Sequence, residues 1–216
     1  MFDWLRRRWG IPTTAVREHW CREWEYGRAN DKALWERETE PELLNEAWQL
    51  REQDPESTFQ VYLAHAELGS VWSMDQLGRC YLKGIGVTSD LNLAEAWYRR
   101  AAEAGSQHGM LACNTLLFRR GDFDACELIL DPAAKANWSP ALYWLARVRF
   151  EKSHSKTTML QVRALLERAA ADDCPGAQWW LGLLLGRGRY GLADIPRGLR
   201  LLWDFARRSR EALTIH

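Results

Sequence analysis

The chain has 216 residues, of which 47% are hydrophobic and 27% charged, and its formal net charge is zero. These values are ordinary for a folded globular protein, and no apolar run approaches the roughly 20 residues that span a bilayer. Nucleic-acid-binding proteins usually carry a basic excess, so we expect no nucleic-acid partner. The 13 tryptophans are the one anomaly of composition, and tryptophan is over-represented where proteins bind one another.

The first ten residues, MFDWLRRRWG, place a short apolar face beside three arginines. Phe2, Leu5 and Trp9 follow at helical spacing, so this segment could dock on an anionic membrane surface. Pro12 limits it to less than about three turns, and the alternative is that it packs onto the rest of the chain. No apolar core of a signal peptide follows, so we expect no secretory signal and a cytoplasmic location.

Residues 1–56 are predicted to form a helical N-terminal cap. Val16, Trp20 and Trp24 recur at i, i+4 and i+8, which is typical of an amphipathic helix. The GRAND segment at 27–31 is expected to break this helix, and Pro41 to begin another. Asp54, in DPES, is expected to cap the N-terminus of the helix that follows.

The rest of the chain repeats itself. The segments beginning at Ala64, Arg100, Pro132 and Arg168 align at offsets of 36, 32 and 36 residues. Three columns of this alignment hold small or apolar residues at all but one position, Asn114: Ser73, Gly109, Ala141 and Ala177; Leu77, Cys113, Leu145 and Leu181; Gly78, Asn114, Ala146 and Gly182. Four copies with one spacing indicate a repeat architecture.

Each copy predicts a pair of helices that cannot fold alone. The small residue and the leucine lie at i and i+4, on one buried stripe, and small residues there let neighbouring helices approach closely. A two-helix unit of this length buries its apolar face only by stacking on its neighbours. We therefore predict an all-α protein, a right-handed α-solenoid of antiparallel helix pairs over 57–207, with a tail at 208–216.

Residues 73–105, which include the stretch LGRCYLKGIGVTSDLNLAEAWYRRAAEAG, resemble a near-complete Sel1-like repeat. That family's pattern runs from a small residue through LG, Tyr, G-x-GV, Asp, Ala, WY and AA to a final Gly. Every position has its counterpart between 73 and 105: Ser73, Leu77, Gly78, Tyr81, Gly84, Gly86, Val87, Asp90, Ala94, Trp97, Tyr98, Ala101, Ala102 and Gly105. The other copies are degenerate, and the one containing FRRGDFDACELIL lacks the G-x-GV turn and runs short.

The two glycine clusters are interpreted as turns between helices. GRGRYG at 186–191 has the spacing of a dinucleotide-binding loop, but that loop needs a preceding strand, and AQWWLGLLL is a helix of the repeat. KGIGVTSD lacks the ending of a phosphate-binding loop. Gly84 suits the left-handed residue after a helix, and Asp90 suits the cap of the next one. Asp194 lies 104 residues after Asp90 and is expected to mark the same helix start. We expect no cofactor.

Neither catalytic nor metal-ligating residues stand out. The five cysteines have no CxxC spacing and no pattern shared with the histidines, so we expect free thiols and no metal site. A bridge between Cys113 and Cys126 is geometrically conceivable. Some cysteine-rich Sel1-like proteins are linked to β-lactam hydrolysis, but their disulfide-pair pattern is absent. We therefore predict that the chain is not an enzyme.

The resemblance directs attention to a groove. In related solenoids the first helix of each pair lines the concave face, and aromatic residues interleaved with charges are typical of protein-binding grooves. Trp144 and Trp180 share the column of Gln76, beside the buried leucine. The predicted partner-binding residues are Trp72, Asp75, Gln76, Arg79, Tyr143, Trp144, Arg147, Trp179 and Trp180. The alternative is that strongly twisted stacking buries these rings.

The resemblance implies a module that binds another protein, since the family includes adaptors, signalling regulators and immunity proteins that neutralise toxins, mostly in bacteria. We predict a non-catalytic protein-interaction module whose partner is another protein. Two alternatives stay open: a membrane-surface scaffold held by residues 1–10, and a β-lactam hydrolase like the cysteine-rich relatives.

Overall fold

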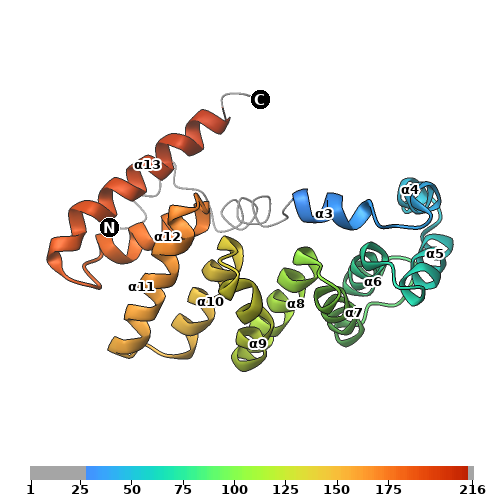
Figure 1. The fold of residues 1–216 in the computed structure, drawn as a ribbon, viewed down its shortest axis with the longest axis horizontal. Coiled ribbons are helices and arrows are strands. Elements are labelled where there is room, and N and C mark those ends of the chain that lie inside the picture. Colours follow the sequence, from blue (N-terminus) through green and yellow to red (C-terminus); the bar gives the residue numbers. More distant parts are fainter. Residues whose placement is uncertain (1–27, 214–216) are drawn as a thin grey trace. The chain divides into compact units, whose positions relative to one another are not determined.

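The computed structural model describes residues 28–213, and every regular element in that range is helical (Figure 1). The helices follow one another in the order α3 (Arg28–Trp35), α4 (Pro41–Leu50), α5 (Pro55–Glu67), α6 (Val71–Lys83), α7 (Leu91–Glu103), α8 (Gln107–Arg120), α9 (Phe123–Lys135), α10 (Ser139–Lys152), α11 (Lys156–Ala171), α12 (Pro175–Gly186), the 3₁₀ turn η1 (Leu192–Asp194) and α13 (Ile195–Leu213). The prediction of an all-α protein made of stacked neighbouring helix pairs is confirmed.

The described residues form two compact units, 28–129 and 130–213, which we call the N-terminal and C-terminal units. In the N-terminal unit α4 packs on α5, α5 on α6, α6 on α7 and α7 on α8, and α3 contacts both α6 and α8. In the C-terminal unit α10, α11, α12 and α13 pack in the same successive way. The predicted boundaries of the cap and the tail stay a prediction; α13 continues to Leu213.

The repeat columns form the buried stripes that their spacing predicts. All twelve residues of the three columns are buried: Ser73, Gly109, Ala141, Ala177, Leu77, Cys113, Leu145, Leu181, Gly78, Asn114, Ala146 and Gly182. The column of Gln76, Ala112, Trp144 and Trp180 is half-buried in every copy. Side chains in the column of Gln76 therefore lie at the edge of the helix interfaces, between core and solvent.

The turns between helices are closed by the residues expected to close them. Asp54 accepts a hydrogen bond from the Ser57 amide at the start of α5. Gly84 ends α6 in the left-handed conformation, with φ of 71°. Asp90 accepts from the amides of Asn92 and Leu93 and so caps α7. These contacts confirm that KGIGVTSD is a turn between two helices.

One connection is shorter than the others, as the sequence predicts for FRRGDFDACELIL. Gly121 ends α8 in the left-handed conformation, and the Asp122 carboxylate accepts from the Ala125 amide in the first turn of α9. Two residues thus do what the seven residues from 84 to 90 do between α6 and α7. The 32-residue offset follows from this shorter connection.

The GRAND segment is not a break throughout, because α3 begins within it at Arg28. The reason is tertiary. The Asn30 amide donates to the Gly105 carbonyl and its oxygen accepts from the Gln107 amide, which fixes α3 against the start of α8. The helix predicted around Val16, Trp20 and Trp24, and the basic segment at 1–10, lie outside the described residues.

Candidate functional site: a cationic pocket and an aromatic cluster

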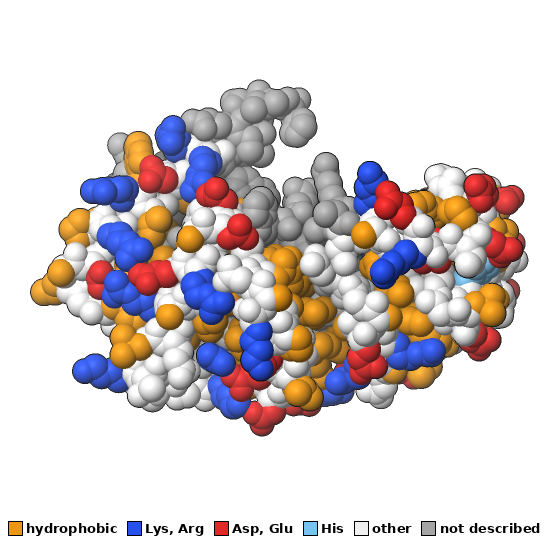
Figure 2. All heavy atoms as spheres, viewed as in Figure 1, with side chains coloured by type: hydrophobic (Ala, Val, Ile, Leu, Met, Phe, Trp, Pro, Cys, Tyr) orange, Lys and Arg blue, Asp and Glu red, His pale blue; other side chains and the backbone are white. Residues whose placement is uncertain are grey.

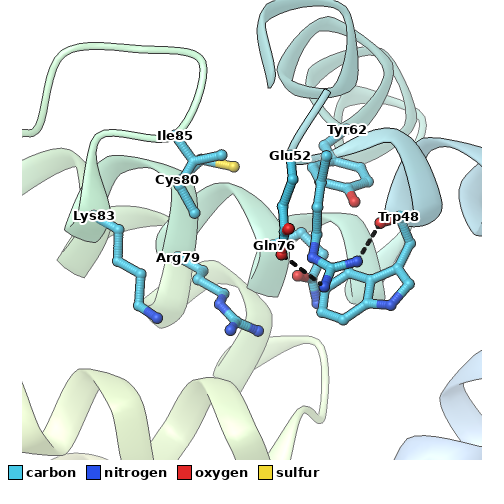
Figure 3. Close-up of a pocket in the computed structure, with 9 residues that line it drawn as sticks. Trp48, Glu52, Tyr62, Gln76, Arg79, Cys80, Lys83 and Ile85 are labelled. Carbon is cyan, nitrogen blue, oxygen red and sulfur yellow. Dashed lines mark hydrogen bonds and ion pairs between the residues drawn. The ribbon is translucent and has the colours of Figure 1, made fainter. Parts of the chain in front are cut away.

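The pocket of the N-terminal unit lies among α4, α5 and α6 and measures about 240 Å³ (Figure 3). We call it the α4–α6 pocket. It is lined by Trp48, Arg51, Glu52, Tyr62, Gln76, Arg79, Cys80, Lys83 and Ile85. Two of the predicted partner-binding residues, Gln76 and Arg79, therefore lie in one pocket.

Trp48 is the aromatic centre of this pocket. The Arg51 guanidinium lies 4.1 Å and the Arg79 guanidinium 5.5 Å from the centre of the Trp48 ring. Both distances are within the range of cation–π attraction. Arg51 also donates to the Trp48 carbonyl oxygen and pairs with the Glu52 carboxylate at 3.4 Å. The indole thus holds two cations of the pocket in place.

Trp72 packs against Trp48 and against two further aromatic rings. The Trp72 ring makes edge-to-face contacts with Trp35, Trp48 and Tyr62 at centroid distances of 5.1, 6.1 and 5.5 Å. Such pairs stabilise a packed cluster by about 0.5–1.5 kcal/mol each beyond the area they bury. Trp72 is half-buried, so the structure gives it a packing role that positions Trp48.

Asp75 lies inside the N-terminal unit. The residue is 5% exposed, and its carboxylate accepts a hydrogen bond of 2.6 Å from the Ser106 hydroxyl. The Asp75 carboxylate also lies 3.4 Å from Nδ1 of His108. Ser106 in turn caps α8 through the Gly109 amide. Asp75 therefore joins α6 to the start of α8, which is a structural role.

The predicted residues of the C-terminal unit form an aromatic cluster on α10 and α12. Tyr143 contacts Trp144 and Trp180 edge-to-face at 5.9 and 6.3 Å, and Phe150 contacts Trp180 at 5.2 Å. The Arg147 guanidinium lies 4.6 Å from the centre of the Trp144 ring. Tyr143 is buried, whereas Trp144, Arg147, Trp179 and Trp180 are half-buried.

The nine predicted residues thus fall into two sets, four on α6 of the N-terminal unit and five on α10 and α12 of the C-terminal unit. The single groove stays a prediction. Sequence reasoning missed Trp48, Arg51, Tyr62 and Lys83 of the α4–α6 pocket. Lys83 could have been found by extending the face of Gln76 and Arg79 by one turn, since residues at i, i+3 and i+7 share a face. The other three come from α4 and α5, which the repeat alignment does not relate to α6.

Ionic contacts within the C-terminal unit tie its helices together. Arg163 pairs with Asp194 at 2.8 Å, and Arg197 pairs with Glu167 at 2.8 Å. On the face shown in Figure 2, basic and acidic side chains are interspersed over α11 to α13. The two ion pairs join α11 to η1 and to α13.

The described cysteines are Cys80, Cys113, Cys126 and Cys174, and all four are buried. Cys80, Cys113 and Cys126 are free thiols. Burial raises the pKa of Cys80 and of Cys113 to about 11, and that of Cys126 to about 12. Thiols held neutral in this way are poor nucleophiles. Within 28–213 no group of three His, Cys, Asp or Glu side chains is placed to hold a metal ion. No helix of that range is long and apolar enough to cross a membrane.

Comparison with known proteins places the chain. The Sel1 repeat model matches residues 73–106 and 175–202. No curated protein sequence matches the chain. Among solved structures, the protective antigen c5321 of uropathogenic Escherichia coli, described as displaying an SLR fold, aligns with a TM-score of 0.58 and 23% sequence identity. The alignment covers 72% of this chain but only 34% of that protein, so the chain spans about a third of its length. The fold and the matched segments agree: the chain contains Sel1 repeats within stacked helix pairs like those of that structure.

Proposed function

We propose that this chain is a non-catalytic protein-interaction module that binds a partner protein through the half-buried aromatic and cationic side chains of its repeat helices. Sel1 repeats generally mediate protein binding. The observation that carries the proposal is the α4–α6 pocket, where Trp48 holds Arg51 and Arg79 beside a helix of the first matched repeat. Tryptophan and arginine in partly buried pockets are the residue types that dominate binding energy at protein interfaces.

The aromatic cluster on α10 and α12 supports the same function in the C-terminal unit. Trp144 and Trp180 are half-buried at the positions that Gln76 occupies in the N-terminal unit, and Arg147 lies over the Trp144 ring. A repeat protein often binds along several repeats, because equivalent positions of successive helices present similar surfaces. We therefore assign partner binding to both surfaces.

The partner can be found by cross-linking the tagged full-length chain in its native cell and identifying proteins captured in constant proportion. The product of an adjacent gene is the first candidate to test. The purified pair is then titrated by calorimetry. We expect Arg79→Ala and the double variant Trp144→Ala/Trp180→Ala each to weaken binding at least tenfold, which corresponds to about 1.4 kcal/mol. Trp203→Ala, an exposed tryptophan on α13, is the matched control and should change the affinity less than twofold.

Equal affinity of all folded variants for the partner would contradict the assignment of these surfaces, and the absence of any protein partner would contradict the function. The role follows from what is captured. For an immunity protein, co-expression with the captured toxin should restore growth. For an adaptor or a regulator, the captured protein should be active by itself and change its activity or location with this chain.

A non-catalytic protein should not turn over substrate. Incubation of the purified chain with a chromogenic β-lactam should give no hydrolysis above buffer. A membrane-surface scaffold would need residues 1–10, so the full chain and a variant that lacks them should sediment equally little with anionic vesicles. Turnover in the first assay, or sedimentation that depends on residues 1–10 in the second, would replace the proposed function by one of the alternatives.

A further inference from the structure

We propose that the α4–α6 pocket binds the carboxylate of a glutamate side chain presented by a peptide segment of the partner protein. The inference rests on the proposed function, because it names the chemistry of what that partner inserts. It follows from three features of the pocket: its uncompensated charge, a buried hydroxyl without a hydrogen-bond partner, and its size.

The first feature is charge. Arg79 and Lys83 lie one turn apart on α6 and extend from it side by side (Figure 3). Neither makes an ion pair with any residue of the described range, whereas Arg51 pairs with Glu52. The pocket therefore keeps about two positive charges in excess. A bound carboxylate would find an arginine fork and an ammonium within one small site, an arrangement that favours anions.

Helix capping accounts for only one of these two cations. Lys83 lies in the last turn of α6, where the helix dipole favours a positive charge. Arg79 lies a full turn earlier, outside the reach of that effect. Its guanidinium is held near the Trp48 ring rather than by a carboxylate. Cation–π contact leaves the N–H donors at the edge of the guanidinium available to an acceptor.

The second feature is the Tyr62 hydroxyl. Tyr62 is 2% exposed, and its hydroxyl has no hydrogen-bond partner among the residues that the structure describes. In Figure 3 the Tyr62 ring points toward Trp48 and Gln76. Buried hydroxyls nearly always have a partner, because a missing hydrogen bond costs about 1–3 kcal/mol. A carboxylate at the inner end of the pocket would accept this hydrogen bond.

Arg51 and Arg79 both lie close enough to the Tyr62 hydroxyl to act on it. Burial raises the pKa of Tyr62, and the positive charges of these two arginines oppose that rise. All three side chains line the same pocket. A carboxylate bound there would have a hydroxyl donor and guanidinium donors on the walls around it.

The third feature is size. At about 240 Å³ the pocket is smaller than the roughly 300–1,000 Å³ typical of sites for cofactors and drug-sized molecules. It has room for a side chain. Trp48 and Ile85 supply apolar wall for the two methylenes of a glutamate, and Gln76 offers a polar group to the neighbouring peptide backbone. The Glu52 carboxylate in the lining disfavours ligands with more charge than one carboxylate.

The test uses two blocked tripeptides, N-acetyl-Ala-Glu-Ala-amide and N-acetyl-Ala-Gln-Ala-amide, which differ only in the carboxylate. Each is titrated into the full chain while the indole N–H signal of Trp48 is followed by nuclear magnetic resonance, the signal being assigned with Trp48→Phe. We expect the Glu peptide to bind at least about tenfold more tightly than the Gln peptide, since hydrogen bonds to charged groups are worth more than neutral ones. The preference should shrink as salt is added, because the Arg79 and Lys83 charges are partly solvated.

Three variants locate the effect. Arg79→Gln/Lys83→Gln should abolish the preference for the Glu peptide. Tyr62→Phe, which keeps the ring and removes the hydroxyl, should reduce it several-fold. The control, Arg37→Gln/Arg119→Gln, removes two exposed positive charges of the same unit outside the pocket and should leave the preference unchanged. Circular dichroism checks that each variant is folded.

Equal binding of the two peptides, no binding of either, or an unchanged preference in Arg79→Gln/Lys83→Gln would each overturn the inference. These outcomes are independent of the proposed function, because no partner protein is present in the titration. A chain that binds its partner but does not distinguish the peptides keeps the function and loses the glutamate site. A chain that prefers the Glu peptide but captures no protein keeps the site and loses the function.

Discussion

Residues 78–98 and 182–202 occupy the same positions of two repeats, 104 residues apart, yet the two helix pairs are packed in different ways. In the N-terminal unit Gly78 makes room for the Tyr98 ring, and a methyl group at Gly78 would lie 2.7 Å from ring carbons of Tyr98. In the C-terminal unit Gly182 faces α13, and a methyl group there would lie 3.2 Å from the Gly198 carbonyl oxygen. The same glycine position of the repeat thus packs against an aromatic ring in the first case and against the backbone of the next helix in the second.

The position of Gly198 explains the closer approach of α13. Its counterpart in the first repeat is Ala94, which is fully buried. A methyl group at Gly198 would overlap the backbone of Leu185 and Gly186. Backbone-to-backbone contact of this kind needs glycine on one helix and a glycine or alanine on the other. The C-terminal pair is therefore joined by close contact of its backbones, and the N-terminal pair by an aromatic ring.

The loops of the two repeats also reach the preceding helix by different chemistry. Gly86 lies so close to the Pro55 carbonyl, at the start of α5, that no side chain would fit between them. Its counterpart Tyr190 lies 5.3 Å from the Arg163 guanidinium of α11, and Asp194 pairs with the same arginine. Both loops are thus fastened to the helix before their repeat, the first by shape and the second by charge.

The largest expected effect is that of Gly86→Ala. Gly86 has φ of 67°, which a side chain disfavours, and the added methyl group would collide with the Pro55 carbonyl. Strain and overpacking of this kind together destabilise a protein by about 3 kcal/mol. Urea unfolding followed by circular dichroism measures the loss. Gly105→Ala is the control: Gly105 has φ of 99° but open space around it, so only the strain, about 1 kcal/mol, should appear.

If both alanine variants lost the same stability, close packing of the loop on α5 would not explain why the repeat keeps glycine at 86. The loss of stability in both variants would then come from the left-handed backbone conformation alone.

The second effect concerns the crossing of α12 and α13. Gly198→Ala introduces a methyl group into a backbone contact, and we expect it to lower the free energy of unfolding by about 2 kcal/mol even though alanine favours the helix. Ala94→Gly, the reverse exchange at the matching position, should cost about 1 kcal/mol through helix propensity and the lost methyl group. A stabilising Gly198→Ala in the same urea assay would show that α13 moves away without penalty.

Much of the fold could be predicted from the sequence, because the same pattern of small and apolar residues recurs in four copies. The columns of Ser73, Leu77 and Gly78 predicted the buried stripe, and Gly84 and Asp90 predicted the turn. Contacts that a helix pair makes with other elements could not be predicted from the repeat pattern. The α4–α6 pocket needs Trp48 from α4, which aligns with no repeat position, and the burial of Asp75 depends on Ser106 from the next helix pair. Periodicity predicts which face is buried, but not which neighbour covers a given side chain.

The third effect appears only in alkaline solution and concerns the thiols of the N-terminal unit. Burial raises the pKa of Cys113 from its ordinary 9.0 to about 11. Near pH 10 the Cys113 thiol has lost its proton in the unfolded chain but keeps it in the folded chain. The contribution of this thiol to the free energy of unfolding is therefore complete below pH 9 and is lost as the pH rises toward 11. The expected loss at pH 10 is about 1 kcal/mol for this thiol. Cys113→Ala should make the dependence of the urea midpoint on pH less steep, while Cys80 and Cys126 keep the remainder. Leu117→Ala, an equally buried truncation, should keep the full slope.

The smallest effect tests whether charge fastens the second loop. A double-mutant cycle of Asp194→Ala and Arg163→Ala should give a coupling energy of about 0.5–1 kcal/mol, because the pair is only partly exposed but Arg163 retains Glu167 as a second partner. Asp90→Ala should be additive with Arg163→Ala, since the Asp90 carboxylate accepts hydrogen bonds from backbone amides of α7. Raising the salt concentration should weaken the Asp194–Arg163 coupling and leave Gly86→Ala unaffected. A coupling energy of zero would mean that Tyr190 alone, stacked beside Arg163, holds this loop, and that shape fastens both repeats.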